Sequence, residues 1–173
     1  MKHFCLNDQD TNRSAHLLTW ASEQDIREIY ARPCEIVVKN ARGSIDCLDD
    51  QTGERKTRGM SAAIAVMSSY NYVGSTWAGG SKALCTELLR DEWGFEGHVV
   101  SDWSLYDYTN KNQAFYAGTD VNLTTTLTTG QMQDAESATA VKAMRRCMHH
   151  YLYSIANSNA MNGKPPTVRV TYK

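Results

Sequence analysis

The sequence predicts an α/β fold in which about four β-strands, each followed by a helix, build a parallel sheet. Two observations predict this class. Short apolar runs alternate along the chain with longer stretches of helical apolar spacing, and 42% of the 173 residues are hydrophobic against 21% charged. That composition is ordinary for a globular protein and is sufficient for one core. Strands that alternate with helices need helical crossovers, which make neighbouring strands parallel.

The first unit begins at the N-terminus. Residues 2–4 are expected to end a strand, and a polar loop follows through residue 20. A helix is predicted at 22–39, because Ser22 and Asp25 have the spacing of a capping box. Pro33 is expected to kink this helix. Its apolar stripe consists of Ile26, Ile29, Tyr30, Ile36 and Val37.

The second unit has a strand near 63–67, a loop at 68–71 and a helix at 81–93. Gly94 stands where a left-handed C-terminal residue is expected. The apolar residues that line this helix are Leu84, Leu88 and Leu89.

The third and fourth units complete the pattern. A strand through 99–100 ends at Asp102, and a short helix is expected near 110–116. The last strand lies at 118–123, and a long helix follows at about 135–157 after a threonine-rich loop. These units predict one parallel sheet with its helices outside.

Two segments lie outside this alternation. Residues 41–60 are charged and glycine-containing, and they are predicted to be an inserted surface loop. Residues 158–173 are expected to be a C-terminal tail or linker. Because residues 2–4 follow Met1 directly, the chain is expected to begin in the middle of a fold.

Composition excludes several partners. The net charge is −1 and the basic residues are scattered, so neither nucleic acid nor an anionic membrane is expected as a partner. No apolar run approaches the length of about 20 residues that spans a bilayer, and no signal peptide is recognised. The five cysteines are isolated and are expected to be reduced, without a zinc site, which favours a cytoplasmic location. No metal or other cofactor is expected.

Polar side chains follow the predicted strands at their C-terminal ends. They are Lys2 and His3, Tyr70 and Asn71, Asp102 and Trp103, and Asp120. Ligands bind at this edge of parallel α/β sheets, so a shared site is predicted. A strand that delivers a carboxylate beside an indole suits a sugar, because the carboxylate can act on the anomeric carbon and the indole packs on the ring. For this segment alone, an N-capping Asp beside a core Trp is the alternative interpretation.

Several segments together resemble the β-glucosidases of glycoside hydrolase family 3, over residues 2 to about 157. They are Lys2-His3-Phe4 with Asn7, Gln9 and Arg13, Met67-Ser68-Ser69-Tyr70-Asn71, Glu92-Trp93-Gly94-Phe95, Ser101-Asp102-Trp103 and Ala117-Gly118-Thr119-Asp120. The resemblance implies a (β/α)8 barrel of the TIM type and an exo-acting, retaining hydrolysis of terminal β-D-glucosyl residues. A full barrel takes about 250 residues, so residues 1–157 are expected to form its second half.

The resemblance also implies roles for individual residues. Asp102 corresponds to the nucleophile, and Trp103 borders the sugar. Tyr70 supports the nucleophile. The residues that hold sugar hydroxyls are Lys2, His3 and Arg13. Asp10 departs from the pattern, because the family often has Glu there.

Alternative interpretations accompany these assignments. Lys2 and His3 can be a frayed N-terminus, Arg13 can pair with Asp10 or Glu28, and Tyr70 can be a loop aromatic. Asp120 is expected to stabilise a loop or cap. The exposed side of the last helix is predicted to carry Lys142, Arg145, Arg146, His149 and His150.

The general acid/base that the family usually supplies from a second domain has no counterpart in the chain. Glu92 belongs to a turn and Glu23 to a helix start, so neither is assigned this role. The expected partners are a β-glucoside or oligosaccharide substrate, together with the missing barrel half and acid/base domain or a second copy of the chain. The alternative function is a non-catalytic half-barrel that binds sugar or serves assembly. A flavodoxin-like binding domain is disfavoured because Gly79-Gly80-Ser81 is too short a phosphate-binding signal.

Overall fold

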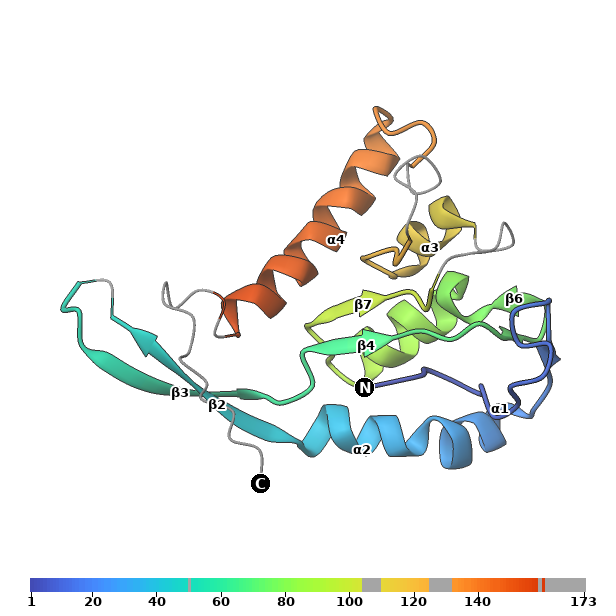
Figure 1. Cartoon of the computed structure of the whole chain (residues 1–173), viewed down its shortest axis with the longest axis horizontal. Helices are drawn as coiled ribbons and strands as arrows, with labels where there is room; N and C mark the ends of the chain where they lie inside the picture. Colours follow the sequence, from blue (N-terminus) through green and yellow to red (C-terminus); the bar gives the residue numbers. More distant parts are fainter. Residues whose placement is uncertain (50, 104–109, 125–131, 159, 161–173) are drawn as a thin grey trace, which may run out of the picture.

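The structure is a computed structural model, and it describes residues 1–49, 51–103, 110–124, 132–158 and 160. Figure 1 shows the elements along the chain. The helices are α1 (Glu23–Asp25), η1 (Ile26–Tyr30), α2 (Arg32–Asn40), η2 (Ala78–Gly80), η3 (Ala83–Glu92), α3 (Lys111–Ala117) and α4 (Ala138–Ala156). The strands are β1 (Leu18–Thr19), β2 (Arg42–Leu48), β3 (Arg55–Ser61), β4 (Ala65–Met67), β5 (Tyr72–Val73), β6 (Thr76–Trp77) and β7 (His98–Val100).

Four parallel segments form the centre of the fold. β4 and β7 pair in parallel, with Val66 opposite Val99. Phe4 bridges Ser68 on one side of this pair, and Val121 bridges Val100 on the other, both in parallel. The segments therefore lie side by side in chain order, which confirms the predicted α/β class with parallel strands.

The N-terminal segment is held by this sheet. Phe4 N donates to Met67 O at 2.8 Å, and Met67 N donates to Met1 O at 2.9 Å. The terminal amino group donates to Ala65 O at 3.0 Å. Lys2 and His3 thus lie between Met1 and Phe4, which are both hydrogen-bonded to β4, and the frayed N-terminus is not what the structure shows.

The first helical stretch starts as predicted but is divided into three. Ser22 caps α1, and its Oγ accepts a hydrogen bond from Asp25 N at 3.1 Å. Pro33 stands in the first turn of α2, where its missing N–H breaks no hydrogen bond, so the helix restarts there instead of kinking. Of the predicted apolar stripe, only Ile26 packs against the core, where it is partly buried. Ile29, Tyr30, Ile36 and Val37 are exposed, whereas Ala31 and Val38 are buried.

The second helix, η3, buries its predicted apolar face, and Gly94 ends it with φ +74° as expected. The π-type hydrogen bonding of this helix was not predicted. Its buried side chains belong to the main core with Phe4, Val66, Trp93, Phe95 and Val99.

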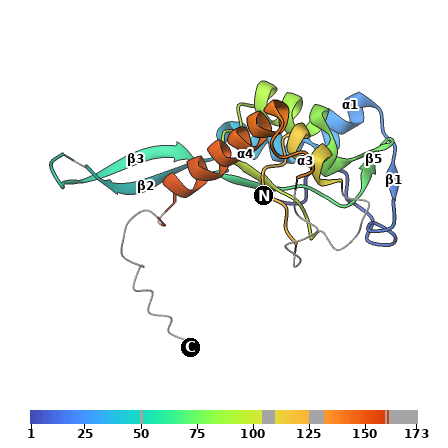
Figure 2. The same cartoon turned by 90° about the horizontal axis from the view of Figure 1, so that it is seen from above.

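Residues 41–60 are a hairpin and not the predicted loop. β2 and β3 pair antiparallel, from Arg42 opposite Ser61 to Leu48 opposite Arg55. Figures 1 and 2 show that this hairpin projects from the body of the molecule, so its surface position agrees with the prediction. The sequence pattern hides the strands because only Ile45 is buried among the paired residues described, and an exposed ribbon needs no apolar face.

The last two helices close the outer layer. Asn110 caps α3, and Ser137 caps α4. α4 packs against β7 and α3. The Ser154 hydroxyl fastens its C-terminal part to the sheet, accepting from His98 N at 3.1 Å and donating to Ile64 O at 2.7 Å. Of the predicted tail, 159 and 161–173 lie outside the described residues. No helix of the described part is both long and apolar enough to cross a bilayer.

Candidate active site

The carboxylate of Asp102 lies just beyond the C-terminal end of β7, at the edge where parallel α/β folds bind ligands. Asp102 Oδ1 accepts a hydrogen bond of 2.7 Å from the backbone N–H of Trp103. Asp102 Oδ2 is buried and has no hydrogen-bond partner within the described residues. The backbone therefore holds one oxygen of this carboxylate, and the other has no such bond within the described residues.

His3 faces the second oxygen. His3 Nε2 lies 3.4 Å from Asp102 Oδ2, and the two side chains are 25% and 14% exposed. Burial lowers the pKa of His3 below its ordinary value, and the negative charge of Asp102 opposes this shift. The nearby cations Lys2 and Arg13 lower the pKa further. A neutral imidazole results near neutral pH, and it can exchange hydrogen bonds with a sugar hydroxyl.

Tyr70 connects this corner to the loop that carries Arg13. The Tyr70 hydroxyl donates to the backbone carbonyl of Trp103 at 2.7 Å. The Arg13 guanidinium lies 5.2 Å from the centre of the Tyr70 ring, within the range of a cation–π contact. Tyr70 is buried, so it supports the residue that follows the nucleophile candidate.

Arg13 also pairs with Asp10, as one alternative anticipated. Arg13 Nε lies 2.9 Å from Asp10 Oδ1. The Asp10 side chain is 90% exposed, so water screens this pair and its contribution to stability is small. Arg13 therefore has both contacts, one with the exposed Asp10 and one with the buried Tyr70. Lys2 is exposed beside His3.

A buried polar layer beneath these residues was not assigned a role from the sequence. The Asn71 amide donates to Cys5 O at 3.2 Å and to Thr19 Oγ1 at 3.0 Å. The Ser101 hydroxyl accepts from Leu123 N at 2.9 Å and donates to Asn122 Oδ1 at 3.1 Å. These bonds fix the loops around the candidate site. The available signal was the position of Asn71 and Ser101 inside the motifs that contain Tyr70 and Asp102.

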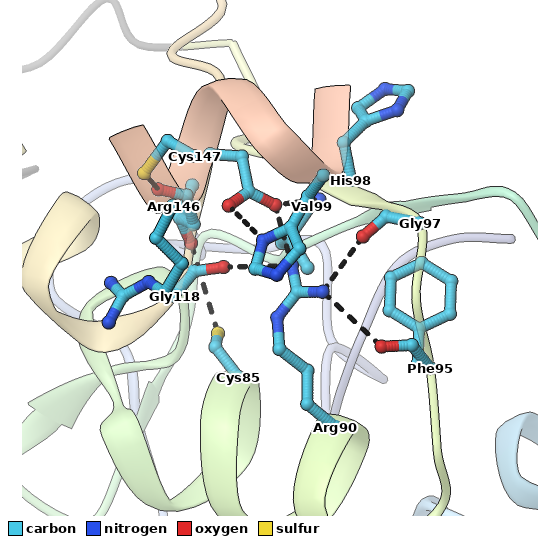
Figure 3. A network of polar contacts seen from close by, with 12 residues as sticks. Cys85, Arg90, Phe95, Gly97, His98, Val99, Gly118, Arg146 and Cys147 are labelled. Atoms are coloured by element: carbon cyan, nitrogen blue, oxygen red, sulfur yellow. Dashed lines mark hydrogen bonds and ion pairs between the residues drawn. The ribbon is translucent and has the colours of Figure 1, made fainter. Parts of the chain in front are cut away.

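Asp120 does not lie at this edge, which corrects the predicted grouping. Its side chain is fully buried on the helix side of the sheet, and it binds Arg90, His150 and the backbone of Val99. Figure 3 labels Arg90 and Val99 within this network. The predicted stabilising role of Asp120 agrees with this position. The prediction was wrong for His150, because α4 turns this side chain inward.

Among the other residues predicted on the exposed side of α4, one faces inward and three are exposed. Arg146 donates to the carbonyl groups of Phe115 and Tyr116 on α3, so it also faces inward, whereas Lys142, Arg145 and His149 are exposed as predicted. The glutamates considered and rejected as acids are both bound to Arg27, whose Nε lies 2.9 Å from Glu23 and whose Nη1 lies 2.6 Å from Glu92. Neither carboxylate belongs to the site. Among the described residues, no group of three or more His, Cys, Asp or Glu side chains is placed to hold a metal ion.

Comparison with known proteins gives this geometry its context. Residues 58–151 match the N-terminal domain of glycosyl hydrolase family 3. The chain belongs to this family. β-Glucosidase A from Butyrivibrio fibrisolvens is 36% identical over 122 residues, which make up 70% of this family 3 chain and 12% of that protein. A β-glucosidase from Ruminococcus albus is 36% identical over 104 residues, or 60% of this chain and 9% of that protein.

Solved structures of the family share its fold. The β-glucosidase of Bifidobacterium adolescentis superposes with a TM-score of 0.76 at 23% identity, covering 98% of this chain and 22% of that one. β-Glucosidase 3B of Thermotoga neapolitana in complex with glucose superposes with a TM-score of 0.65 at 28% identity, covering 93% of this chain and 21% of that one. This family 3 chain thus spans a small part of the length of the relatives that it matches.

Proposed function

We propose that this chain carries the nucleophile side of a retaining β-glucosidase site, with Asp102 as the nucleophile. The observation that supports this most is the unequal state of the two carboxylate oxygens. Oδ1 is oriented by the Trp103 N–H, whereas Oδ2 is buried, has no hydrogen-bond partner among the described residues and lies 3.4 Å from His3 Nε2. A buried polar atom without a partner destabilises a fold, so such an atom in a native site calls for a ligand.

The chemistry follows from this arrangement. Asp102 Oδ2 forms a bond to the anomeric carbon of a β-glucoside while the bond to the leaving oxygen breaks and its electron pair departs with that oxygen. Water then attacks the same carbon and gives up a proton to a general base, and the carboxylate leaves with the electron pair that it had shared. His3, Lys2 and Arg13 hold sugar hydroxyls through hydrogen bonds, the charged ones being stronger. The indole of Trp103 packs on the apolar face of the ring.

Four parallel segments in chain order support the view that residues 1–157 are half of a (β/α)8 barrel. The outer two, at Phe4 and Val121, make only isolated bridges within the described residues. Retaining hydrolysis needs a second carboxyl about 5–5.5 Å from the nucleophile. We infer that this acid/base and the other barrel half come from another part of the protein or from another chain.

A non-catalytic sugar-binding half-barrel is the second candidate. It is favoured because no residue of the chain is assigned as the acid/base. The two functions differ in one observable step, because only the first forms a covalent bond to Asp102.

The deciding experiment is intact-mass analysis after incubation with a 2-deoxy-2-fluoro β-glucoside that carries a dinitrophenyl leaving group. This leaving group departs without acid assistance, so the reaction isolates the nucleophile from the acid/base. A stoichiometric adduct on the peptide that contains Asp102 is expected. Saturable glucose binding without an adduct supports the sugar-binding module instead.

The matched variant is Asp102→Asn. It keeps the size of the side chain and an acceptor for Trp103 N, and it removes the attacking carboxylate. We expect adduct formation to fall by at least about 10³-fold, because a missing nucleophile leaves only binding contributions. The melting temperature should not fall, since the substitution removes a buried charge. Adduct formation at the wild-type rate in Asp102→Asn would refute the nucleophile assignment.

A further inference from the structure

The proposed reaction does not use the fully buried carboxylate of Asp120, which has three polar partners. Its Oδ2 atom accepts from Arg90 Nη2 at 2.6 Å and from Val99 N at 2.7 Å, and its Oδ1 atom lies 2.8 Å from His150 Nδ1. Arg90 belongs to η3 and Val99 to β7, both labelled in Figure 3, and His150 belongs to α4. A buried carboxylate is costly unless it is paired and hydrogen-bonded, and here both conditions are met.

The hydrogen bond from Val99 N to the Asp120 carboxylate contributes to the pairing of the sheet. Val99 lies in β7 and turns its backbone N–H and C=O toward the fourth parallel segment. Its carbonyl accepts from Asp120 N at 2.8 Å and from Val121 N at 3.0 Å. Its N–H has the Asp120 carboxylate as acceptor, where a regular ladder would supply a backbone carbonyl. The side chain of Asp120 thus completes the pairing of β7.

The other donors hold Asp120 in place from both sides of β7. Arg90 also donates to Gly97 O at 2.8 Å, just before β7, and to Gly118 O at 3.3 Å, just before Asp120. His150 reaches the same carboxylate from α4. One guanidinium therefore ties the start of β7 to the start of the fourth segment, and one imidazole ties both to the outer helix.

The two thiols near this network, those of Cys85 and Cys147, are uncharged. Burial raises the pKa of Cys85 to about 11 and that of Cys147 to about 12, so both remain protonated at neutral pH. The network accordingly consists of one anion, one guanidinium and one imidazole, with backbone groups around them.

We propose that Asp120, held by Arg90 and His150, is a positioning residue that sets the place of β7 and thereby aims the Asp102 carboxylate at the anomeric carbon. This inference rests on the proposed function of Asp102. Asp102 follows Val99 by three residues, or about 10 Å of extended chain. A displacement of about 1 Å at a reacting group can lower a rate by about 10²-fold, so a small shift of β7 is sufficient to slow the reaction.

The test compares two substitutions of His150 in the full chain. His150→Phe keeps an aromatic ring and removes the donor, whereas His150→Asn keeps an N–H close to the place of Nδ1. We expect His150→Phe to lower the saturating rate of adduct formation with the fluoroglucoside by 10- to 100-fold. The probe concentration at half of that rate should change less than twofold. His150→Asn should restore the rate to within about threefold of wild type.

A matched control separates positioning from general stability. The Thr86 hydroxyl donates to Ala117 O at 2.7 Å, a bond that joins η3 to α3 and does not involve β7. Thr86→Val should lower the melting temperature without changing the rate of adduct formation. An equal loss of rate in Thr86→Val and His150→Phe would overturn the positioning role, and so would a wild-type rate in His150→Phe.

A second measurement keeps this inference apart from the proposed function. Hydrogen exchange of the Trp103 amide reports its bond to Asp102 Oδ1. We expect His150→Phe to speed this exchange by at least fivefold, whereas Thr86→Val and His150→Asn leave it unchanged. A wild-type chain that forms no adduct would refute the proposed function alone, and unchanged exchange in His150→Phe would refute the positioning role.

Discussion

Trp103 contacts the candidate site through its backbone, and in the proposed function its side chain contacts the ligand. Its N–H binds Asp102 and its carbonyl accepts from Tyr70. Both bonds survive truncation of the side chain. The indole is half-buried, whereas Trp77 and Trp93 are buried in the interior.

Trp103→Ala should therefore weaken sugar binding more than it weakens the fold. An aromatic contact contributes about 0.5–1.5 kcal/mol beyond burial, so we expect the Kd for glucose, measured by calorimetry, to rise about 3- to 10-fold. The matched control is Trp93→Ala, because Trp93 packs edge-to-face on Phe4 with ring centres 5.8 Å apart. That change should cost about 3–5 kcal/mol of unfolding free energy. An unfolded Trp103→Ala chain beside a folded Trp93→Ala chain would assign Trp103 to the core.

The sequence predicts the position of a residue best where a single local motif determines that position. Asp102 follows a strand of β-branched residues, and such a strand must end at the sheet edge. Arg90 and His150 escaped prediction because their partner, Asp120, comes from another unit of the fold. A long-range ion pair leaves no mark on local spacing, so His150 looked like part of a solvated helix face.

At the scale of the element, the burial of His98 in β7 links its protonation to the stability of the fold. Burial lowers the pKa of His98, Asp120 acts in the opposite direction, and Arg90 adds to the lowering. His98 Nδ1 is buried without a hydrogen-bond partner among the described residues. Below pH 6.5, the ordinary pKa of histidine, His98 binds a proton in the unfolded chain. In the folded chain its lowered pKa disfavours this protonation.

Stability should consequently fall as the pH decreases from 6.5 toward the lowered pKa, and it should not respond to this group above 6.5. His98→Phe keeps the edge-to-face contact with Tyr151, whose ring centre lies 5.5 Å away, and removes the titration. We expect the urea midpoint of this variant to vary less between pH 7 and pH 5 than that of the wild type. The pKa of His3 is also lowered, so a residual slope is expected. Identical slopes in the two proteins would contradict the assignment to His98.

The elements also show where sequence patterns mislead. The β2–β3 hairpin is stabilised by its backbone ladder and by polar pairs such as Thr57 with Asp46, at 2.9 Å, so it lacks the alternation that indicates a strand. The helices of the parallel units were predictable because burial against a sheet imposes an apolar spacing. That spacing does not say which neighbour covers the face, and on η1 and α2 no described element covers it.

At the scale of the whole molecule, seven of the eleven large apolar residues that are exposed in the described part lie on the first and last helical stretches. They are Ile29, Tyr30, Ile36 and Val37 on η1 and α2, and Met148, Tyr151 and Leu152 on α4. In Figure 1, α2 and α4 run along opposite sides of the β4–β7 pair. A sheet with open edges and apolar helices beside them favours association, since monomers rarely expose large contiguous apolar patches.

We therefore expect the isolated chain to associate in a concentration-dependent way, which sedimentation velocity measures directly. Ile36 and Leu152 are 49% and 54% exposed, so Ile36→Glu and Leu152→Glu place a charge on these faces without opening the core. Each should shift the population toward the monomer with little change in melting temperature, because surface substitutions usually alter stability by less than about 0.5 kcal/mol. The control Gln51→Glu adds the same charge at the exposed tip of the hairpin and should leave association unchanged. A chain that stays monomeric at every concentration would mean that the two faces do not drive assembly, and the second barrel half that we propose would then have to be recognised through the sheet edges at Phe4 and Val121.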